Sequence, residues 1–185
     1  MKRTKIKDIL QKGIANETVV AKGWVRTRRG SKNVFFIALN DGSIIHNLQV
    51  VVDVNNFEEA LLREINTGAS LSVTGKLADS TGSGQNIELI AEEVELIGAA
   101  DPDKFPIQPK RHTLEFLREN AHLRFRTSTF SAIFRVRHAM AFAIHKYFNE
   151  KGFNYLHTPI ITAKNSTIKR QASTVKFSPE ESKYK

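Results

Sequence analysis

Five stretches of the first hundred residues are rich in Val, Ile, Phe and Trp or alternate apolar with polar side chains, as half-buried β-strands do. Between the third and fourth stretches, apolar positions recur at helical spacing over residues 55–65, with Asn55 or Asn56 as the expected cap. Clusters of Gly, Asn, Asp and Ser separate most of these elements. The predicted strands lie at residues 18–27, 33–40, 47–53, 69–77 and 86–97.

Three strands, a helix and two further strands follow one another in the order of an OB-fold, a five-stranded barrel with Greek-key connections. In that fold the second and third strands and two hairpin loops form the ligand surface. The corresponding loops here are residues 28–33 and 79–84. The sequence therefore predicts a mainly β chain with α-helices, in which residues 5–12 form a short helix or an extended lead-in to the barrel.

The pattern changes after residue 100. Three prolines within residues 99–109 break any regular element and predict a linker. Apolar spacing predicts helices at 114–119 and 128–150, and a strand follows at 153–161. The longer helix is apolar on two sides and needs two partners, so we expect only the start of an incomplete α+β domain. The predicted divisions are a barrel at 1–100, a linker and short helix at 101–127, a helix and strand at 128–163, and a divergent polar tail at 164–185.

Composition narrows the functional classes. The 185 residues include no cysteine, which excludes disulfides and thiolate metal sites and fits a cytoplasmic protein. No apolar run reaches the roughly 18 residues that a membrane helix requires. The formal charge of +9 is uneven, with +8 in residues 1–33, −8 in residues 34–100 and +9 in residues 101–185. Two basic regions favour a polyanionic partner, and a merely solvated face is the alternative for the last of them.

The first predicted loop carries the cations Arg28, Arg29 and Lys32 beside the aromatic pair Phe35 and Phe36. Neighbouring strand residues point to opposite sides, so we expect one phenylalanine in the core and the other beside the cations. A basic loop next to an aromatic surface is typical of single-stranded nucleic-acid binding, where cations meet phosphates and rings stack on bases. No pattern of histidines and carboxylates predicts a metal site, and no nucleophile–base pair predicts a catalytic centre.

Three blocks of the sequence occur in the order and spacing of a known family. They are GWVRTRRGSKNVFFIALNDGS followed by LQVVV, then PIQPKRHTLEFLRENAHLRFRT, then FRVRHAMAFAIHKYFNEKGFNYLHTPIIT. Together they resemble the asparaginyl-tRNA synthetases over about residues 5–163. The segments KRHTLEFLR and AHLR are similar to the asparaginyl rather than the aspartyl enzymes, which share the barrel and the long helix.

The resemblance implies that the barrel binds the anticodon stem-loop of a tRNA. By position, Phe36 would stack on the central uracil and Gln49 would hydrogen-bond its edge. Arg29 would approach the anticodon backbone or its first bases, and Glu88 is similar to a family carboxylate that contacts an anticodon base. The expected nucleic-acid-binding set is Arg28, Arg29, Lys32, Phe36, Gln49 and Glu88.

The helix at 128–150 and the strand ending at Pro159 resemble class II motif 1, which builds the homodimer interface of the family, with Ile133 and Met140 at the interface. The family attaches asparagine to tRNA with ATP and Mg²⁺, using arginines of motifs 2 and 3. After Ala163 no resemblance to those motifs is visible, so we expect a ligase truncated after motif 1. Such a chain would hold no catalytic residue, metal or cofactor and would be inactive alone. A stand-alone barrel that binds tRNA or single-stranded RNA, and a fragment of an aspartyl enzyme, are the alternatives.

Overall fold

The computed structural model describes residues 2–80, 82 and 85–157. Five strands close into a barrel in the order β1–β2–β3–β5–β4. β3 and β5 run parallel, and the other neighbours are antiparallel. The predicted OB-fold is therefore confirmed. The strands are β1 (Thr18–Gly30), β2 (Val34–Asn40), β3 (Leu48–Asp53), β4 (Ser70–Asp79) and β5 (Ile87–Gly98).

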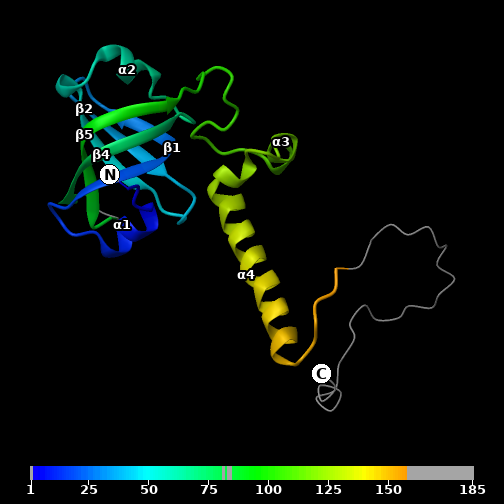
Figure 1. The fold of residues 1–185 in the computed structure, drawn as a ribbon. Coiled ribbons are helices and arrows are strands. Elements are labelled where there is room, and N and C mark those ends of the chain that lie inside the picture. The colour runs from blue at the N-terminus through cyan, green and yellow to red at the C-terminus, as the bar shows by residue number, and fades with distance from the viewer. Residues whose placement is uncertain (1, 81, 83–84, 158–185) are drawn as a thin grey trace. The chain divides into compact units, whose positions relative to one another are not determined.

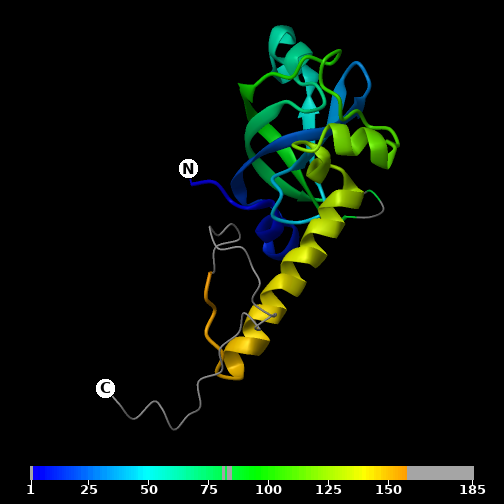
Figure 2. The ribbon, with the colours of Figure 1, turned by 90° about the vertical axis from the view of Figure 1, so that its right-hand side faces the viewer.

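Two short helices lie at the two ends of the barrel. Figures 1 and 2 show α1 (Ile6–Lys12) at one end and α2 (Glu59–Glu64) at the other. After the barrel, α3 (Leu114–Glu119) and α4 (Ser128–Glu150) have the predicted bounds. The 3-10 turns are η1 (Val54–Asn56) and η2 (Arg124–Arg126).

The helix predicted over residues 55–65 is shorter in the structure. The Asp53 carboxylate accepts a hydrogen bond from the Asn55 backbone N–H at 3.0 Å and thereby caps η1. Phe57 then adopts extended backbone, with φ −134° and ψ 150°, and packs against the barrel core. The predicted asparagine caps are therefore wrong, because this tertiary contact interrupts the helix and α2 begins at Glu59.

The barrel interior holds the hydrophobic core. Alternate positions of the strands point inward, and α1 and α2 each add apolar side chains to the same cluster. Burial of this surface is the main force that closes the barrel. Fully buried members include Ile6, Ile9, Ile37, Leu39, Leu48, Val50, Val52, Ile65, Leu71, Leu77 and Leu89.

Residues 101–127, predicted as a linker with a short helix, pack with the barrel. Ile107 and Leu117 are buried, and the Phe105 ring covers Gly68 so closely that a Cβ there would lie 2.8 Å away. Contacts divide the chain into two compact units, of which the first ends at Ser131. The proline-rich segment is therefore an ordered part of the first unit.

The second unit contains most of α4 and the turn that follows it. Gly152 has φ +80°, as expected of a left-handed helix cap. The Tyr155 ring packs edge-on against His145 at 4.9 Å, and the Phe153 ring against Phe148 at 5.4 Å. None of the helices that the structure describes is long and apolar enough to span a membrane.

The strand predicted at residues 153–161 is wrong over its described part. Phe153 forms an isolated bridge, and residues 154–157 have no regular structure. A strand needs the hydrogen bonds of a neighbour, and no described strand pairs with residues 154–157. Pro159 and the tail at 164–185 lie outside the described residues.

Candidate nucleic-acid interface

Three neighbouring strands place a cation, an aromatic ring and an amide on one outer face of the barrel. The register pairs Arg29 with Phe36, Thr27 with Ala38, and Ala38 with Gln49. Directly opposed residues of neighbouring strands point to the same face. An open hollow of about 540 Å³ lies over this face. It is lined by Leu10, Gln11, Thr27, Arg29, Phe36, Ala38, Ile44, His46, Asn47, Gln49, Gln85 and Asn86.

A β-bulge in β1 decides which of its arginines reach this face. The register passes from Val25 opposite Leu39 to Thr27 opposite Ala38, so Arg26 is an extra residue. Such a bulge re-aims the side chains that follow it. Val25 is consequently buried in the core, whereas Arg26 and Thr27 both line surface hollows.

Three polar side chains form a hydrogen-bonded chain across the face. Arg29 Nη2 donates to Gln49 Oε1 at 3.2 Å, and Gln49 Nε2 donates to Glu88 Oε2 at 3.1 Å. The same carboxylate oxygen accepts from Ser80 Oγ at 3.4 Å. A carboxylate only accepts and a guanidinium only donates, so these partners fix the orientation of the amide. Each end of the amide uses one of its two hydrogen-bonding positions, and the other can meet a ligand.

Phe35 and Phe36 take opposite sides of β2, as strand alternation predicts. Phe35 packs against the core cluster, and Phe36 lines the hollow. Arg28 places its Cζ 4.0 Å from the Phe35 ring centroid and donates to the carbonyl oxygens of Leu62 at 2.8 Å and Ile65 at 3.2 Å. Burial lowers the pKa of Arg28. Arg28 therefore holds the C-terminal end of α2, where cations are favourable, and its expected contact with nucleic acid stays a prediction.

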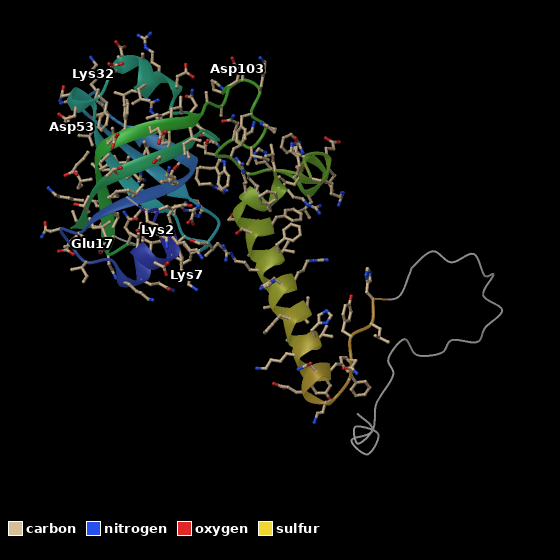
Figure 3. The ribbon with its side chains drawn as sticks, viewed as in Figure 1. Lys2, Lys7, Glu17, Lys32, Asp53 and Asp103 are labelled. Carbon is tan, nitrogen blue, oxygen red and sulfur yellow. The ribbon has the colours of Figure 1, made fainter. Side chains whose placement is uncertain are left out.

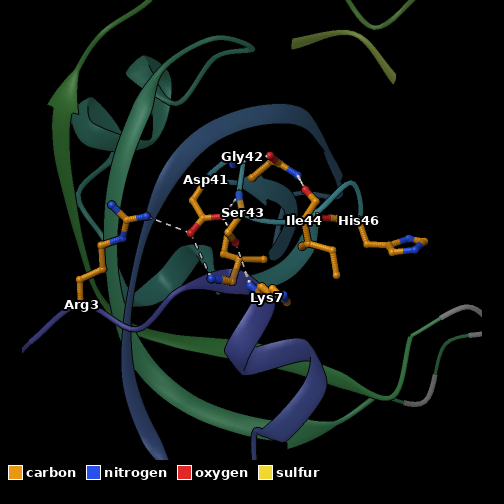
Figure 4. Close-up of polar contacts among 9 residues, drawn as sticks. Arg3, Lys7, Asp41, Gly42, Ser43, Ile44 and His46 are labelled. Carbon is orange, nitrogen blue, oxygen red and sulfur yellow. Dashed lines mark hydrogen bonds and ion pairs between the residues drawn. The ribbon is translucent and has the colours of Figure 1, made fainter. Parts of the chain in front are cut away.

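α1 contributes two residues to the hollow. The loop after β2 holds this helix in place (Figure 4). Asp41 Oδ2 accepts from the Ile6 backbone N–H at 3.1 Å and from Arg3 Nη2 at 2.9 Å. Ser43 Oγ accepts from the Lys7 backbone N–H at 3.0 Å. The residue before α1 supplies no side-chain cap, so the loop satisfies these first N–H groups instead.

Asp41 titrates below the ordinary range of an aspartate. Its side chain is 2% exposed, and burial alone would raise its pKa. Hydrogen bonds from Ser43, from the Ile6 backbone and from Arg3 outweigh that effect and lower the pKa. A carboxyl whose pKa falls on folding stabilises the fold above its unfolded pKa, about 3.9. That contribution is lost as the pH drops through the folded pKa.

We expect Asp41→Asn to lower the free energy of unfolding at pH 7 by about 1–3 kcal/mol, because buried donors lose a charged acceptor. The difference from the unchanged protein should shrink once the pH falls below about 4. Urea denaturation at pH 7 and pH 3 measures both effects. Asp103→Asn, at an exposed position (Figure 3), is the control and should change little. Equal stability of the two variants at pH 7 would show that Asp41 does not cap α1.

The third cation of the predicted loop lies away from the hollow. Figure 3 shows Lys32 near Asp53 at the α2 end of the barrel, with Lys2, Lys7 and Glu17 at the α1 end. Lys32 is exposed and does not line the hollow. Its expected contact with nucleic acid stays a prediction.

Several polar residues of the hollow escaped the sequence analysis because they come from loops or from α1. They have no repeating pattern, and only the closed barrel brings them beside Gln49. Asn47, for example, accepts a hydrogen bond from Asn40 Nδ2 at 3.1 Å across the β2–β3 loop. The sequence did contain one signal for these residues, because the polar pair His46 and Asn47 stands directly before β3. The missed residues are Gln11, His46, Asn47, Gln85 and Asn86.

The chemistry of this face suits single-stranded RNA. An exposed ring stacks on any base, an oriented amide reads a base edge, and a cation meets the backbone. Over residues 2–80, 82 and 85–157, no group of three His, Asp or Glu side chains is placed to hold a metal ion.

Two family models match the chain. One describes an OB-fold nucleic acid binding domain and matches residues 19–97. The other describes class II tRNA synthetases (D, K and N) and matches residues 113–182. The second match continues past Ala163 into the tail that was expected to be divergent.

Curated relatives are similar over most of this chain. An asparagine–tRNA ligase of Parabacteroides distasonis is 60% identical over 163 residues, which are 88% of this chain and 35% of the relative. An asparagine–tRNA ligase of Cytophaga hutchinsonii is 56% identical over 168 residues, which are 90% of this chain and 36% of the relative. The chain spans about a third of the length of these relatives.

Solved structures share the fold. The asparaginyl-tRNA synthetase from Pyrococcus horikoshii superposes with a TM-score of 0.75 at 23% identity, covering 87% of this chain and 38% of that chain. A putative aspartyl-tRNA synthetase from Leishmania major gives a TM-score of 0.73 at 18% identity, covering 92% of this chain and 36% of that chain. At these identities the likeness establishes the fold.

Proposed function

This chain is homologous to the amino-terminal third of asparagine–tRNA ligases, and on that premise we propose that its barrel binds the anticodon loop of a tRNA. The observation that carries the proposal is the shared face of Arg29, Phe36 and Gln49. The match of the barrel to a nucleic-acid-binding domain supports it.

Each member of the face has a distinct task. Phe36 stacks on the central base, and Arg29 meets the adjoining backbone while holding Gln49. Gln49 then accepts from the N3–H of uracil and donates to its O4. Cytosine needs the opposite arrangement, with the amide turned over. Glu88 opposes that rotation, because its carboxylate cannot donate to an amide oxygen.

A hairpin with uracil at the central anticodon position should bind more tightly than the same hairpin with cytosine, by about 1–3 kcal/mol. Gln49→Leu should abolish this preference. Glu88→Gln should reduce it while keeping most of the affinity, because a neutral amide accepts either orientation of Gln49. Fluorescence anisotropy with the four combinations of base and residue 49 isolates the pairwise effect. If Gln49→Leu still prefers the uracil hairpin, Gln49 is not the residue that recognises the base.

The ligase reaction itself belongs to the same proposal. The relatives' name and the class II model support an enzyme that joins asparagine to tRNA. ATP supplies the free energy that activates the amino acid in such a reaction, and Mg²⁺ neutralises the ATP phosphates. Among the described residues, no group of three His, Asp or Glu side chains is placed to hold that ion.

We extend the proposal to a homodimer formed through α4. Ile133 is 42% exposed and Met140 is 61% exposed, and further large apolar side chains of this helix are open to solvent. An apolar surface of this kind is typical of an interface. Light scattering on the purified chain should show a dimer or larger species, and Met140→Glu should shift it toward the monomer. Lys146→Gln is the control, and a monomeric unchanged chain would contradict the proposal.

A further inference from the structure

A second cavity, of about 470 Å³, adjoins the hollow on the outer face of the barrel. Thr27 and Asn47 line both spaces, so the two are neighbours along β1 and the loop before β3. The second cavity is bounded by β1, by the ordered segment at residues 105–112 and by η2. Its remaining walls include Trp24, Arg26, Lys110, Arg111 and Arg126.

Arg26 and Arg126 both line this cavity. The bulge in β1 turns Arg26 toward it, and Arg126 places its Cζ 4.5 Å from the Trp24 ring centroid. Burial lowers the pKa of Arg26, and the charge of Arg126 lowers it further. Within the described part of the chain, neither guanidinium forms an ion pair with a carboxylate. The unbound protein therefore holds two like charges together at a cost in free energy.

Arg126 also has an unsatisfied donor. Its Nε is buried and has no hydrogen-bond partner among the described residues. Buried donors are nearly always paired in native proteins, because the loss of water is not otherwise compensated. An anion between the two guanidinium groups would relieve their repulsion and supply acceptors at once.

We propose that this cavity binds a backbone phosphate of the same RNA whose base occupies the neighbouring hollow. The inference rests on the proposed anticodon binding and adds a second contact to it. Paired guanidinium groups match the oxygens of a phosphate, and the Trp24 ring packs against the Arg126 guanidinium. The two spaces share Thr27 and Asn47 as lining residues, which favours RNA over an acidic peptide, because one strand can place a base in the first and a phosphate in the second.

The test compares Arg26→Gln and Arg126→Gln with Arg118→Gln in the full chain. Arg118 is exposed and ion-paired with Glu115 at 3.1 Å, so its loss removes an equal charge elsewhere. Each cavity variant should weaken binding of an anticodon hairpin about tenfold. Each should also reduce the slope of log affinity against log salt by about 1, equally for uracil and cytosine hairpins.

This design separates the two proposals. In one outcome the protein prefers the uracil hairpin, but the cavity variants bind like Arg118→Gln at every salt concentration. That result overturns the phosphate site and leaves the base reader intact. Weaker binding by the cavity variants without any uracil preference supports the phosphate site and refutes the base reader. Arg26→Gln should leave the melting temperature unchanged or raise it, because it relieves repulsion. A lower melting temperature with unchanged affinity would mean that Arg26 is structural, which overturns the proposal.

Trp24 is the sole tryptophan of the sequence, so its fluorescence reports on this cavity directly. The hairpin should change that fluorescence, and Arg26→Gln should shift the change to about tenfold higher hairpin concentration. Inorganic phosphate and polyglutamate are the comparison probes for a free anion and an acidic peptide. A response to either of them, with none to the hairpin, overturns the proposal.

Discussion

Phe36→Ala should weaken binding of an anticodon hairpin by about 1–3 kcal/mol, the contribution of one stacked base. The ring lines the hollow opposite Arg29 and lies one strand away from Gln49. The backbone contacts remain in the variant, so the loss should be similar at low and high salt. Fluorescence anisotropy at two salt concentrations measures it.

Phe35→Ala is the matched control. Phe35 packs against the core and carries the Arg28 guanidinium on its ring, so truncation should lower the melting temperature. The molecules that remain folded should bind the hairpin with unchanged affinity. If Phe35→Ala loses binding and Phe36→Ala does not, the assignment of the two faces is inverted.

Gly30→Ala should destabilise the chain and weaken RNA binding together. Gly30 has φ +150°, and a Cβ there would lie 2.2 Å from the Val34 carbonyl oxygen and 2.9 Å from Phe35 Cα. The backbone strain alone costs about 1–3 kcal/mol, and the collision adds to it. Relief requires the hairpin to open, which moves Arg29 away from Phe36. Thermal denaturation and hairpin affinity of the same preparation test both effects.

Gly42→Ala is the comparison that separates the cost of backbone strain from the cost of a steric collision. Gly42 has φ +80° but nothing within 4 Å of the position of a Cβ, so only the left-handed backbone costs energy, about 1–2 kcal/mol. The loss of stability in Gly30→Ala should exceed that in Gly42→Ala. Equal losses would show that the β1–β2 hairpin is not packed as described.

The barrel was predictable because its signals are local. Strand residues and turn residues alternate along the first hundred positions, and the order of elements selects one topology. The errors arise where distant contacts override local pattern. Phe57 packs on the core and is not part of the predicted helix. The proline-rich segment is ordered by the burial of Ile107 and by the contact of Phe105 with Gly68.

The surface residues also divide into those that a local pattern predicts and those that depend on distant contacts. Arg28 and Arg29 are adjacent and chemically identical, and the bulge at Arg26 decides which of them faces the hollow. Strand alternation predicts the opposed phenylalanines, but no local pattern links Asp41 to the start of α1. Arg26 and Arg126 are a hundred residues apart in the chain and meet only in the folded protein.

The most direct test of the central claim places a photoreactive base in the hollow. A hairpin with 4-thiouridine at the central anticodon position is bound to the full chain and irradiated, and mass spectrometry identifies the linked residue. We predict linkage to Phe36 or to another residue that lines the hollow, and its loss when excess unmodified hairpin competes. Competed linkage confined to residues outside the hollow, such as those of α4, would contradict the account.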